Sequence, residues 1–517
     1  MGRDVKPILT VKGGKIMMKG GKIMERSIKR ILAVLASVFL AMSLFSCGGG
    51  GGGGTTTGGG TTTPTLSGTV ATGKPLASVA VYLKDSKGNI RSTITDANGK
   101  FSFDTSGLTP PFYLKTQGYS LFSYTDQKSG TANITPLSTA VVAVANNGNA
   151  DIYTNPPSQL NLDNAKTSLK NLLNPVLQKY GVQNADFITT PFDANGQRMD
   201  AVLDSIFISV NSDKTIEIKN PFTGETIGKG TLSNGSVSIA DPVTSDEANN
   251  LPNSVKSYKY FAYVKDNYGS PEDGPRMVDI VDAGNGKISV TITTTEGDTG
   301  DIFFIYGNGT KSGNSISFTA SVIMCHDRNE NGTGTAEFTG TIDANGNITG
   351  TFKNTLSAGD TCRENNSNIY EGTFTAEDVT NASPANVAGT YDAYATPYRY
   401  PSAEGPATLQ ITQNGSSINV SITAIDGDTG KTFTRTGQGT VYGNYVIFRV
   451  PIIICHDTNA NAEAEYATFF GKFDSTTNTI SGIYGDGVPA EDYCKAPDYD
   501  TTRQITAAEG SWRAVKK

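Results

Sequence analysis

Short runs of alternating apolar and polar residues recur along most of the chain. Val79, Val81 and Leu83 follow this alternation, and the pattern returns at 101–103. A period of two residues is typical of a half-buried β-strand. Turns rich in Gly, Asn and Asp separate the runs, such as DANG at 96–99, and these residues accept the positive φ angles of tight hairpins. The pattern predicts a mainly β protein.

One segment follows a helical period instead. The apolar residues of 160–181 recur at spacings of three and four, which predicts an amphipathic helix. They are Leu162, Ala165, Leu169, Leu172, Leu173, Val176 and Leu177. Pro175 is expected to kink the helix and Gly181 to cap it. A second short helix is expected over 200–205, directly before a strand. We therefore interpret 146–250 as a small α+β connector.

The C-terminal half is an internal duplication. Residues 288–331 align without gaps to 418–461, and about half of the aligned positions are identical. The repeat units are 256–378 and 387–512. Within each unit, strands joined by short Gly/Asn turns indicate an antiparallel meander. Such a meander either closes into an up-and-down barrel, which removes its edges, or forms a two-sheet sandwich.

Length and charge limit the classes of function. A chain of 517 residues exceeds one hydrophobic core and implies two to four domains. Nine Lys/Arg and two Asp/Glu give residues 1–46 a charge of +7. Because the whole chain has a net charge of −7, the remaining residues carry −14. Nucleic-acid binding is not expected, because phosphate contacts need clustered Lys and Arg.

The N-terminus has the features of an export signal. Arg26, Lys29 and Arg30 precede an apolar run over 31–45 that is too short for a spanning helix. We therefore expect a signal peptide over 1–46. The repeated KGGKIM at 12–17 and 19–24 suggests that translation begins at Met24, or at Met17 or Met18, because Lys-Gly-Gly codons can encode a ribosome-binding site. Residues 1–23 would then precede the true start.

The sequence LFSC at 44–47 resembles the lipobox of bacterial lipoproteins. The resemblance implies that Cys47 becomes the first mature residue and carries lipid, which anchors the protein to a membrane. Gly48 in place of Asp implies the outer membrane, on its periplasmic or cell-surface face. The Gly/Thr-rich segment 47–65 is expected to be a flexible tether.

Two further resemblances concern domains. Residues 66–145, with TDANGKFSF at 95–103, resemble the carboxypeptidase regulatory-like domain, a prealbumin-like β-sandwich whose usual roles are spacing, stiffening and binding. The DANG segment is interpreted as a hairpin turn, because it lacks the acidic residues of a calcium loop. GNITGTF at 346–352 resembles lipocalin- or avidin-like barrels, in architecture only.

The remaining four cysteines fall into two equivalent pairs. These are Cys325 with Cys362 and Cys455 with Cys494. An exported protein meets an oxidising environment, so we predict one disulfide in each repeat, worth about 3–4 kcal/mol. Zinc or a cysteine nucleophile is not expected, because a bridged cysteine is no thiolate. His326 and His456, the only histidines, are then expected to hydrogen-bond within their own loops.

Calcium is the one cofactor that the loops after these histidines suggest. Alternate positions carry oxygen ligands, as at the start of an EF-type loop. They are Asp327, Asn329 and Asn331 in the first repeat and Asp457, Asn459 and Asn461 in the second. The alternative is a polar hairpin loop whose Asx side chains bond their own backbone. The closing acid is displaced, because Glu337 stands one position early.

These features favour a non-enzymatic outer-membrane or cell-surface lipoprotein whose modules bind or adhere to an envelope protein or a glycan. The alternative is a carrier in which each barrel holds a small ligand or lipid. An envelope hydrolase is a third hypothesis, although the chain has neither G-x-S-x-G nor H-E-x-x-H. No catalytic residue is predicted.

Overall fold

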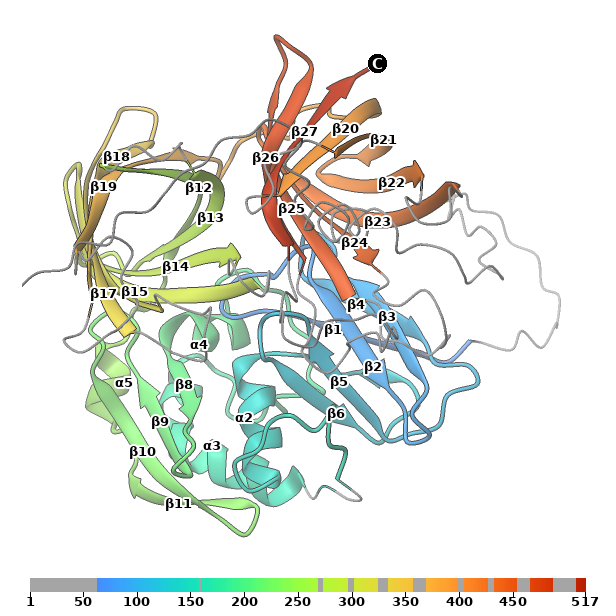
Figure 1. Cartoon of the computed structure of the whole chain (residues 1–517). Coiled ribbons are helices and arrows are strands. Elements are labelled where there is room, and N and C mark those ends of the chain that lie inside the picture. Colours follow the sequence, from blue (N-terminus) through green and yellow to red (C-terminus); the bar gives the residue numbers. More distant parts are fainter. Residues whose placement is uncertain are drawn as a thin grey trace, which may run out of the picture.

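The computed structural model describes eleven stretches of the chain. They are residues 63–157, 160, 162–267, 273–295, 302–323, 333–356, 369–397, 404–425, 432–452, 465–486 and 508–517. These stretches form a sandwich, a connector and two barrels, and Figure 1 shows the sandwich and connector lying beneath the barrels. No helix within these stretches has the length and apolar character needed to cross a membrane.

Two β-sheets make up the N-terminal sandwich. One has the order β4-β1-β7 and the other β3-β2-β5-β6. The strands are β1 (Thr65–Thr69), β2 (Ala80–Lys84), β3 (Ile90–Ile94), β4 (Lys100–Asp104), β5 (Phe112–Thr116), β6 (Phe122–Thr125) and β7 (Gly130–Thr131). In β2, Val81 and Leu83 face the sandwich core, whereas Tyr82 packs in a second cluster with Tyr466 of a barrel. This sheet is therefore covered on both faces.

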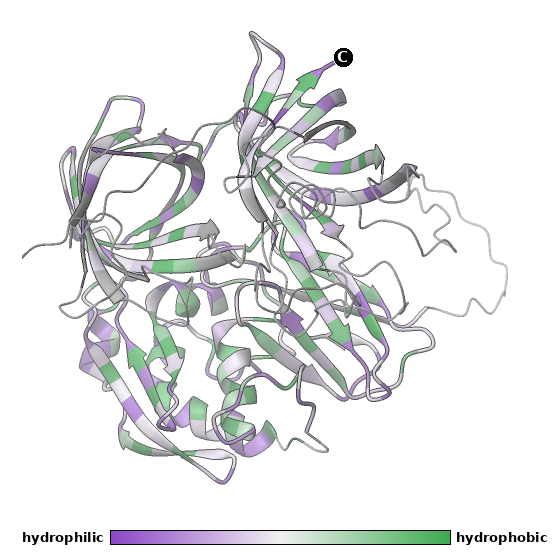
Figure 2. Cartoon of the chain, in the orientation of Figure 1, coloured by the Kyte–Doolittle hydropathy of each residue, from purple (hydrophilic) through white to green (hydrophobic). Residues whose placement is uncertain are grey.

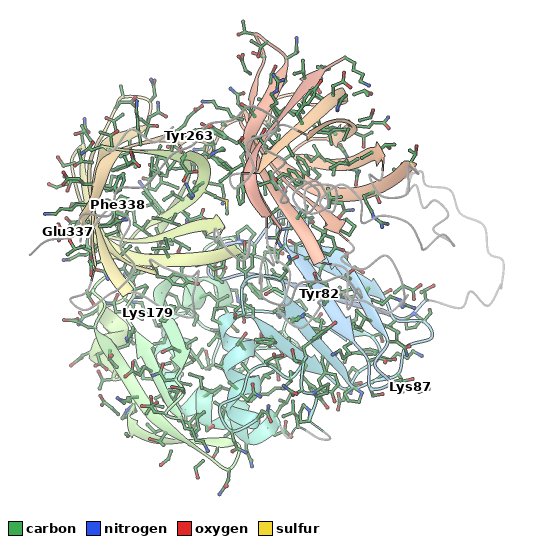
Figure 3. The ribbon with its side chains drawn as sticks, in the orientation of Figure 1. Tyr82, Lys87, Lys179, Tyr263, Glu337 and Phe338 are labelled. Carbon is green, nitrogen blue, oxygen red and sulfur yellow. The ribbon has the colours of Figure 1, made fainter. Side chains whose placement is uncertain are left out.

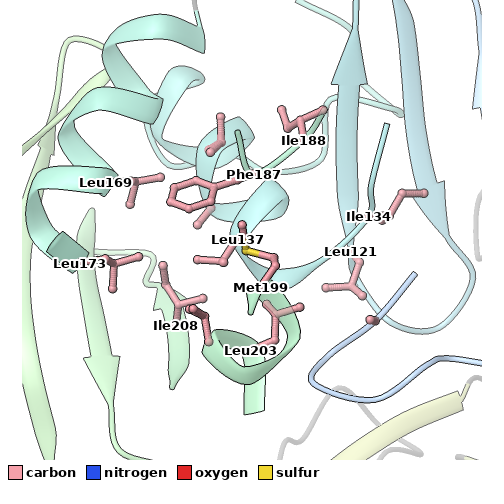
Figure 4. Packing of buried hydrophobic residues seen from close by; sticks show 14 of the residues in the cluster. Leu121, Ile134, Leu137, Leu169, Leu173, Phe187, Ile188, Met199, Leu203 and Ile208 are labelled. Atoms are coloured by element: carbon pink, nitrogen blue, oxygen red, sulfur yellow. The ribbon is translucent and has the colours of Figure 1, made fainter. Parts of the chain in front are cut away.

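The connector shares its core with the sandwich. Its elements are the helices α3 (Leu162–Lys179), α4 (Met199–Ser205) and α5 (Ser245–Asn250) and the sheet of β8 (Phe207–Val210), β9 (Thr215–Lys219), β10 (Thr226–Ser233) and β11 (Ser236–Asp241). The helix α2 (Pro136–Ala145) lies at the end of the 66–145 segment and packs against α3. Leu137, Leu169 and Leu203 of three helices meet in one cluster that also contains sandwich residues (Figure 4). The two parts are thus one packed body.

The duplicated half forms two closed eight-stranded antiparallel barrels. Barrel 1 consists of β12 (Lys256–Asp266), β13 (Asp273–Asp282), β14 (Lys287–Thr295), β15 (Ile302–Ser312), β16 (Ser315–Ile323), β17 (Thr333–Ile342), β18 (Ile348–Leu356) and β19 (Ile369–Asp378). Barrel 2 consists of β20 (Gly389–Pro397), β21 (Glu404–Asn414), β22 (Ser417–Ile425), β23 (Thr432–Tyr442), β24 (Tyr445–Ile452), β25 (Glu465–Asp474), β26 (Thr479–Asp486) and β27 (Ala508–Lys516). The first strand of each barrel pairs with its last, so neither barrel has an edge strand.

Equivalent aromatic stacks fill the two barrels. The rings of Phe318 and Phe338 stack at 4.6 Å in barrel 1, and those of Phe448 and Phe469 stack at 4.8 Å in barrel 2. Alternation along each strand directs such side chains inward and their neighbours outward, which Figure 2 shows as alternating hydropathy.

Glycine lets neighbouring strands approach beside these rings. A Cβ on Gly309 would lie 2.6 Å from Cβ of Phe318, and one on Gly439 would lie 2.5 Å from Cβ of Phe448. The nearest atoms to such a Cβ are the backbone carbonyl oxygens of Ser317 and Ile447, so any larger residue would force the paired strands apart.

The structure confirms the mainly β class. Of the two folds expected for each repeat, a closed barrel or a two-sheet sandwich, it shows the closed barrel. It also confirms the helical face of α3, whose predicted residues are buried apart from the partly buried Leu162. Gly181 has a φ of 68°, as expected of a capping glycine. In the DANG turn, Oδ1 of Asp96 accepts hydrogen bonds from the backbone N–H groups of Asn98 and Lys100, both at 2.8 Å.

Candidate functional site

Each barrel has two different ends, because successive connections of a meander alternate between them. At the turn end of barrel 1, strands are joined by short turns such as 313–314. At the opposite end, which we call the loop end, the connections include 324–332 and 357–368. Barrel 2 repeats the arrangement, with 453–464 and 487–507 at its loop end.

The residues predicted to carry chemistry all lie outside the described residues. Cys47 lies in the N-terminal part, and the rest lie in loop-end connections. The latter are Cys325, Cys362, Cys455, Cys494, the two histidines and the six candidate calcium ligands. The strands that flank these connections place both cysteines of a pair at the same barrel end, as a disulfide would require. The disulfides and the calcium site remain predictions.

The interior of barrel 1 changes character along its axis. The half near the turn end is apolar, with Ile288, Ile316 and Ile348 buried. The half near the loop end carries polar side chains on inward-facing strand positions. In the strand register, Asp266 lies opposite Gly372 and Asn354 lies opposite Ala336, and these positions face the barrel interior. Oδ1 of Asn354 is buried without a hydrogen-bond partner. Barrel 1 is therefore apolar at its turn end and polar toward its loop end.

The two barrels contact each other through outward-facing side chains. The rings of Phe261 and Tyr445 stack 4.3 Å apart with an angle of 3° between their planes. The Tyr445 hydroxyl donates to Glu377 Oε2 at 2.8 Å, and Lys472 Nζ pairs with the same oxygen at 2.6 Å. An apolar stack bordered by polar contacts is typical of an interface between domains.

A buried ionic cluster ties barrel 1 to the sandwich. Asp279 Oδ1 lies 2.9 Å from Lys259 Nζ and 3.4 Å from Lys74 Nζ, and Lys74 belongs to the sandwich. Burial alone would raise the pKa of Asp279, but the two lysines outweigh it and the pKa is lowered. Burial lowers the pKa of Lys74, whereas the carboxylate reverses that effect on the pKa of Lys259. Asp279 therefore stays ionised and holds both domains.

The sandwich also contacts barrel 2, near Tyr82 in Figure 3. Ser78 and Thr440 hydroxyls lie 2.9 Å apart in a buried position, and Gln117 Nε2 donates to the Tyr466 carbonyl at 3.0 Å. Tyr119 lies where all three parts meet, with its ring 4.1 Å from that of Phe304 in barrel 1. Burial raises the pKa of Tyr119 to about 12, so its hydroxyl stays protonated and serves in hydrogen bonding rather than as a nucleophile.

A pair of buried carboxyl groups lies on α4, next to this meeting point. Asp200 and Asp204 are 1% and 5% exposed, and Oδ2 of Asp200 accepts a hydrogen bond from Gly196 at 2.6 Å. Both oxygens of Asp204 are buried without a partner, and a Cβ on Gly73 would lie 2.7 Å from one of them. Burial raises the pKa of Asp200 to about 7, and burial with the neighbouring Asp200 raises that of Asp204 to about 8.

Neither the ionic cluster nor the carboxyl pair was predicted from the sequence. The ionic cluster joins Lys74 to the distant Lys259 and Asp279 and follows no motif. For the carboxyl pair a signal was present, because Asp200 and Asp204 are four residues apart in the helix expected over 200–205 and so share one of its faces.

Comparison with known proteins adds little. No protein-family model and no curated protein matches the sequence significantly. Among solved structures, a chain from Bacteroides fragilis described as a "putative outer membrane protein" is 12% identical. The match covers 51% of this chain and 97% of that chain, with a TM-score of 0.14. Such a likeness carries no argument about function.

Proposed function

We propose that this protein is a non-enzymatic binding protein of the bacterial envelope, anchored by lipid at Cys47, and that the loop ends of its barrels bind an envelope protein or a glycan. One observation carries the proposal. Two closed barrels of common origin keep tight turns at one end and place all their longer connections at the other. Loops held by a rigid scaffold are the usual location of binding residues.

The interfaces between the parts support a shared task for the two barrels. The Phe261–Tyr445 stack and the Asp279 ion pairs hold the barrels to each other and to the sandwich. Two similar binding surfaces on one rigid body can bind a repeated or surface-bound partner with greater avidity than either surface alone. A glycan chain or an array of envelope proteins is such a partner.

The anchoring and the location follow from the lipobox resemblance and are part of the same proposal. We expect the protein to be exported and held at the outer membrane, with the Gly/Thr-rich segment 47–65 as its tether. Labelling cells with a radioactive fatty acid tests this step. The wild-type protein should carry label and fractionate with the outer membrane, whereas Cys47→Ser should carry none.

A second candidate function is the binding of one small polar ligand inside barrel 1. It is favoured by Asp266, Arg276 and Asn354 at inward positions near the loop end. Such a polar interior is unsuited to an apolar lipid, because polar groups lose their hydration when they are buried against an alkyl chain. Native mass spectrometry of the full protein, purified from its own host, would reveal a bound small molecule if this candidate is correct.

Binding to purified envelope glycans and outer-membrane fractions tests the main proposal. The loop-end variant replaces His326, Asp327, His456 and Asp457 by alanine, and the control replaces the exposed turn-end residues Asn345 and Thr476 by alanine. The wild type and the control should bind the same partner, and the loop-end variant should bind it at least tenfold more weakly. Equal binding by all three would refute the proposal.

A further inference from the structure

Arg449 is one of the large side chains that are almost completely buried in the described part of the chain. It lies on β24 of barrel 2, points outward and is covered by the sandwich, so that only 2% of it is exposed. Its electrostatic neighbours are Tyr119 and Tyr82 of the sandwich and Tyr466 of barrel 2. The arginine thus lies within the interface between the two parts, away from the loop ends.

Two of the three guanidinium nitrogens of Arg449 lack a hydrogen-bond acceptor. Nε and Nη1 are both buried without a partner, and no carboxylate among the described residues forms an ion pair with Arg449. Burial lowers the pKa of Arg449, and a hydrogen bond with the Tyr119 hydroxyl offsets only part of that effect. A buried cationic donor without an acceptor is unfavourable, and natural structures provide a partner, an ion or water at such positions.

The surrounding charge is also unbalanced. Tyr119 lies between Arg449 and the ionic cluster, where Asp279 is the carboxylate partner of both Lys74 and Lys259. The other nearby acids, Asp200 and Asp204, are buried, and burial raises the pKa of Asp200 to about 7 and, with the neighbouring Asp200, that of Asp204 to about 8, so together they carry less than the two negative charges of ionised carboxylates at neutral pH. The region where the three parts meet therefore carries an excess of positive charge, which attracts an anion.

The arginine is not needed to build the barrel. In barrel 1 the equivalent residue is Thr319, which is exposed, whereas the inward-facing Phe318 and Phe448 on the preceding position are shared. A neutral residue therefore suffices for the barrel itself. The cation in barrel 2 belongs to the interface with the sandwich.

We propose that Arg449 and Tyr119 bind a small oxyanion such as phosphate at the interface between the sandwich and barrel 2. Nε and Nη1 donate charge-assisted hydrogen bonds to its oxygens, and the Tyr119 hydroxyl contributes a third contact. Bound anion completes the interface and fixes the sandwich against barrel 2. The site is separate from the loop ends and goes beyond the proposed binding function.

Thermal unfolding of the full-length protein tests the proposal. The midpoint is followed as inorganic phosphate, sulfate, acetate or glycerol phosphate replaces sodium chloride at constant ionic strength. Phosphate should raise the wild-type midpoint in a saturable way, as expected for a ligand that binds the folded state. The order of the four anions distinguishes a free inorganic ion from a carboxylate or an organic phosphate.

Three variants assign the effect. Arg449→Met should weaken phosphate binding about ten- to hundredfold, the loss expected for charge-assisted hydrogen bonds. Tyr119→Phe keeps the charge and should weaken it less, and it also serves if Arg449→Met fails to fold. Arg513→Met, at an exposed outward position of the same barrel, is the matched control and should respond as the wild type does.

Equilibrium dialysis with labelled phosphate gives the stoichiometry, which should be one per chain. Two results would overturn the proposal. One is a wild-type midpoint that phosphate shifts no more than chloride does. The other is an equal response in the wild type, Arg449→Met and Tyr119→Phe, which would mean an adventitious ion only.

Discussion

Replacement of Asp204 by Asn should change how stability depends on pH. Asp204 lies on α4, 5% exposed, with both carboxyl oxygens buried and unpartnered. Burial, with the neighbouring Asp200, raises the pKa of Asp204 from 3.8 to about 8. The folded protein therefore keeps a proton on this carboxyl group at pH values where the unfolded chain has lost it. Asn has the same shape as the protonated acid and cannot ionise.

The sign follows from the binding of protons to the two states. Between about pH 4 and the folded pKa of about 8, the folded state binds more protons than the unfolded state, so the free energy of unfolding falls as pH rises. One group changes that free energy by about 1.4 kcal/mol per pH unit. From pH 5 to pH 7 the wild type should therefore lose about 2–3 kcal/mol that Asp204→Asn does not lose.

Urea unfolding of the wild type and Asp204→Asn at several pH values measures this difference. Titrating groups that the substitution leaves unchanged contribute equally to both proteins, so their contributions cancel. Asp186→Asn is the matched control. Burial opposes ionisation of Asp186, but the ion pair with Lys166 at 2.7 Å and two backbone hydrogen bonds outweigh it and lower its pKa. The control should lose stability above pH 4. A difference between Asp204→Asn and wild type that stays flat from pH 5 to pH 7 would refute the reasoning.

Three other predictions concern the scaffold. Asp279→Asn leaves two buried lysines without their carboxylate and should cost about 3–5 kcal/mol in urea unfolding; a loss below about 1 kcal/mol would mean that water solvates the cluster. Phe448→Ala removes a ring from the stack in barrel 2 and should cost about 3–5 kcal/mol, whereas Thr319→Ala, at an exposed position, should cost little. Peptide mapping without reductant should find one disulfide within each barrel, and a bridge between barrels would contradict the duplication argument. The expected pairs are Cys325–Cys362 and Cys455–Cys494.

Much of the fold was predictable because local periodicity determines which face of a strand or helix is apolar. The alternation in both repeats indicated antiparallel strands, and the spacing from Leu162 to Leu177 indicated α3 and its buried face. Alternation does not say whether a sheet is also covered on its other face. Tyr82 was therefore not recognised as a contact between the sandwich and Tyr466 of barrel 2.

The interfaces between domains could not be predicted for a related reason. Lys74 is far along the chain from Lys259 and Asp279, which are partners on the neighbouring strands β12 and β13, and a charged residue on an outward strand position usually lies in water. Only the packing of whole domains removes that water. The loop-end residues could be named from the duplication, since both repeats carry them. The identity of the binding partner could not be predicted, because residue spacing does not specify what these loops recognise.

The central claim is that the protein binds its partner through the loop ends of the barrels, and site-specific photo-crosslinking on intact cells tests it most directly. A photoreactive amino acid is placed at Thr299 or Thr429, in loop-end connections, and at Ala344 or Ser475, in turn-end connections. The account predicts that loop-end positions crosslink the same envelope component in both barrels and that turn-end positions do not. Crosslinks that form only at the turn ends would contradict it.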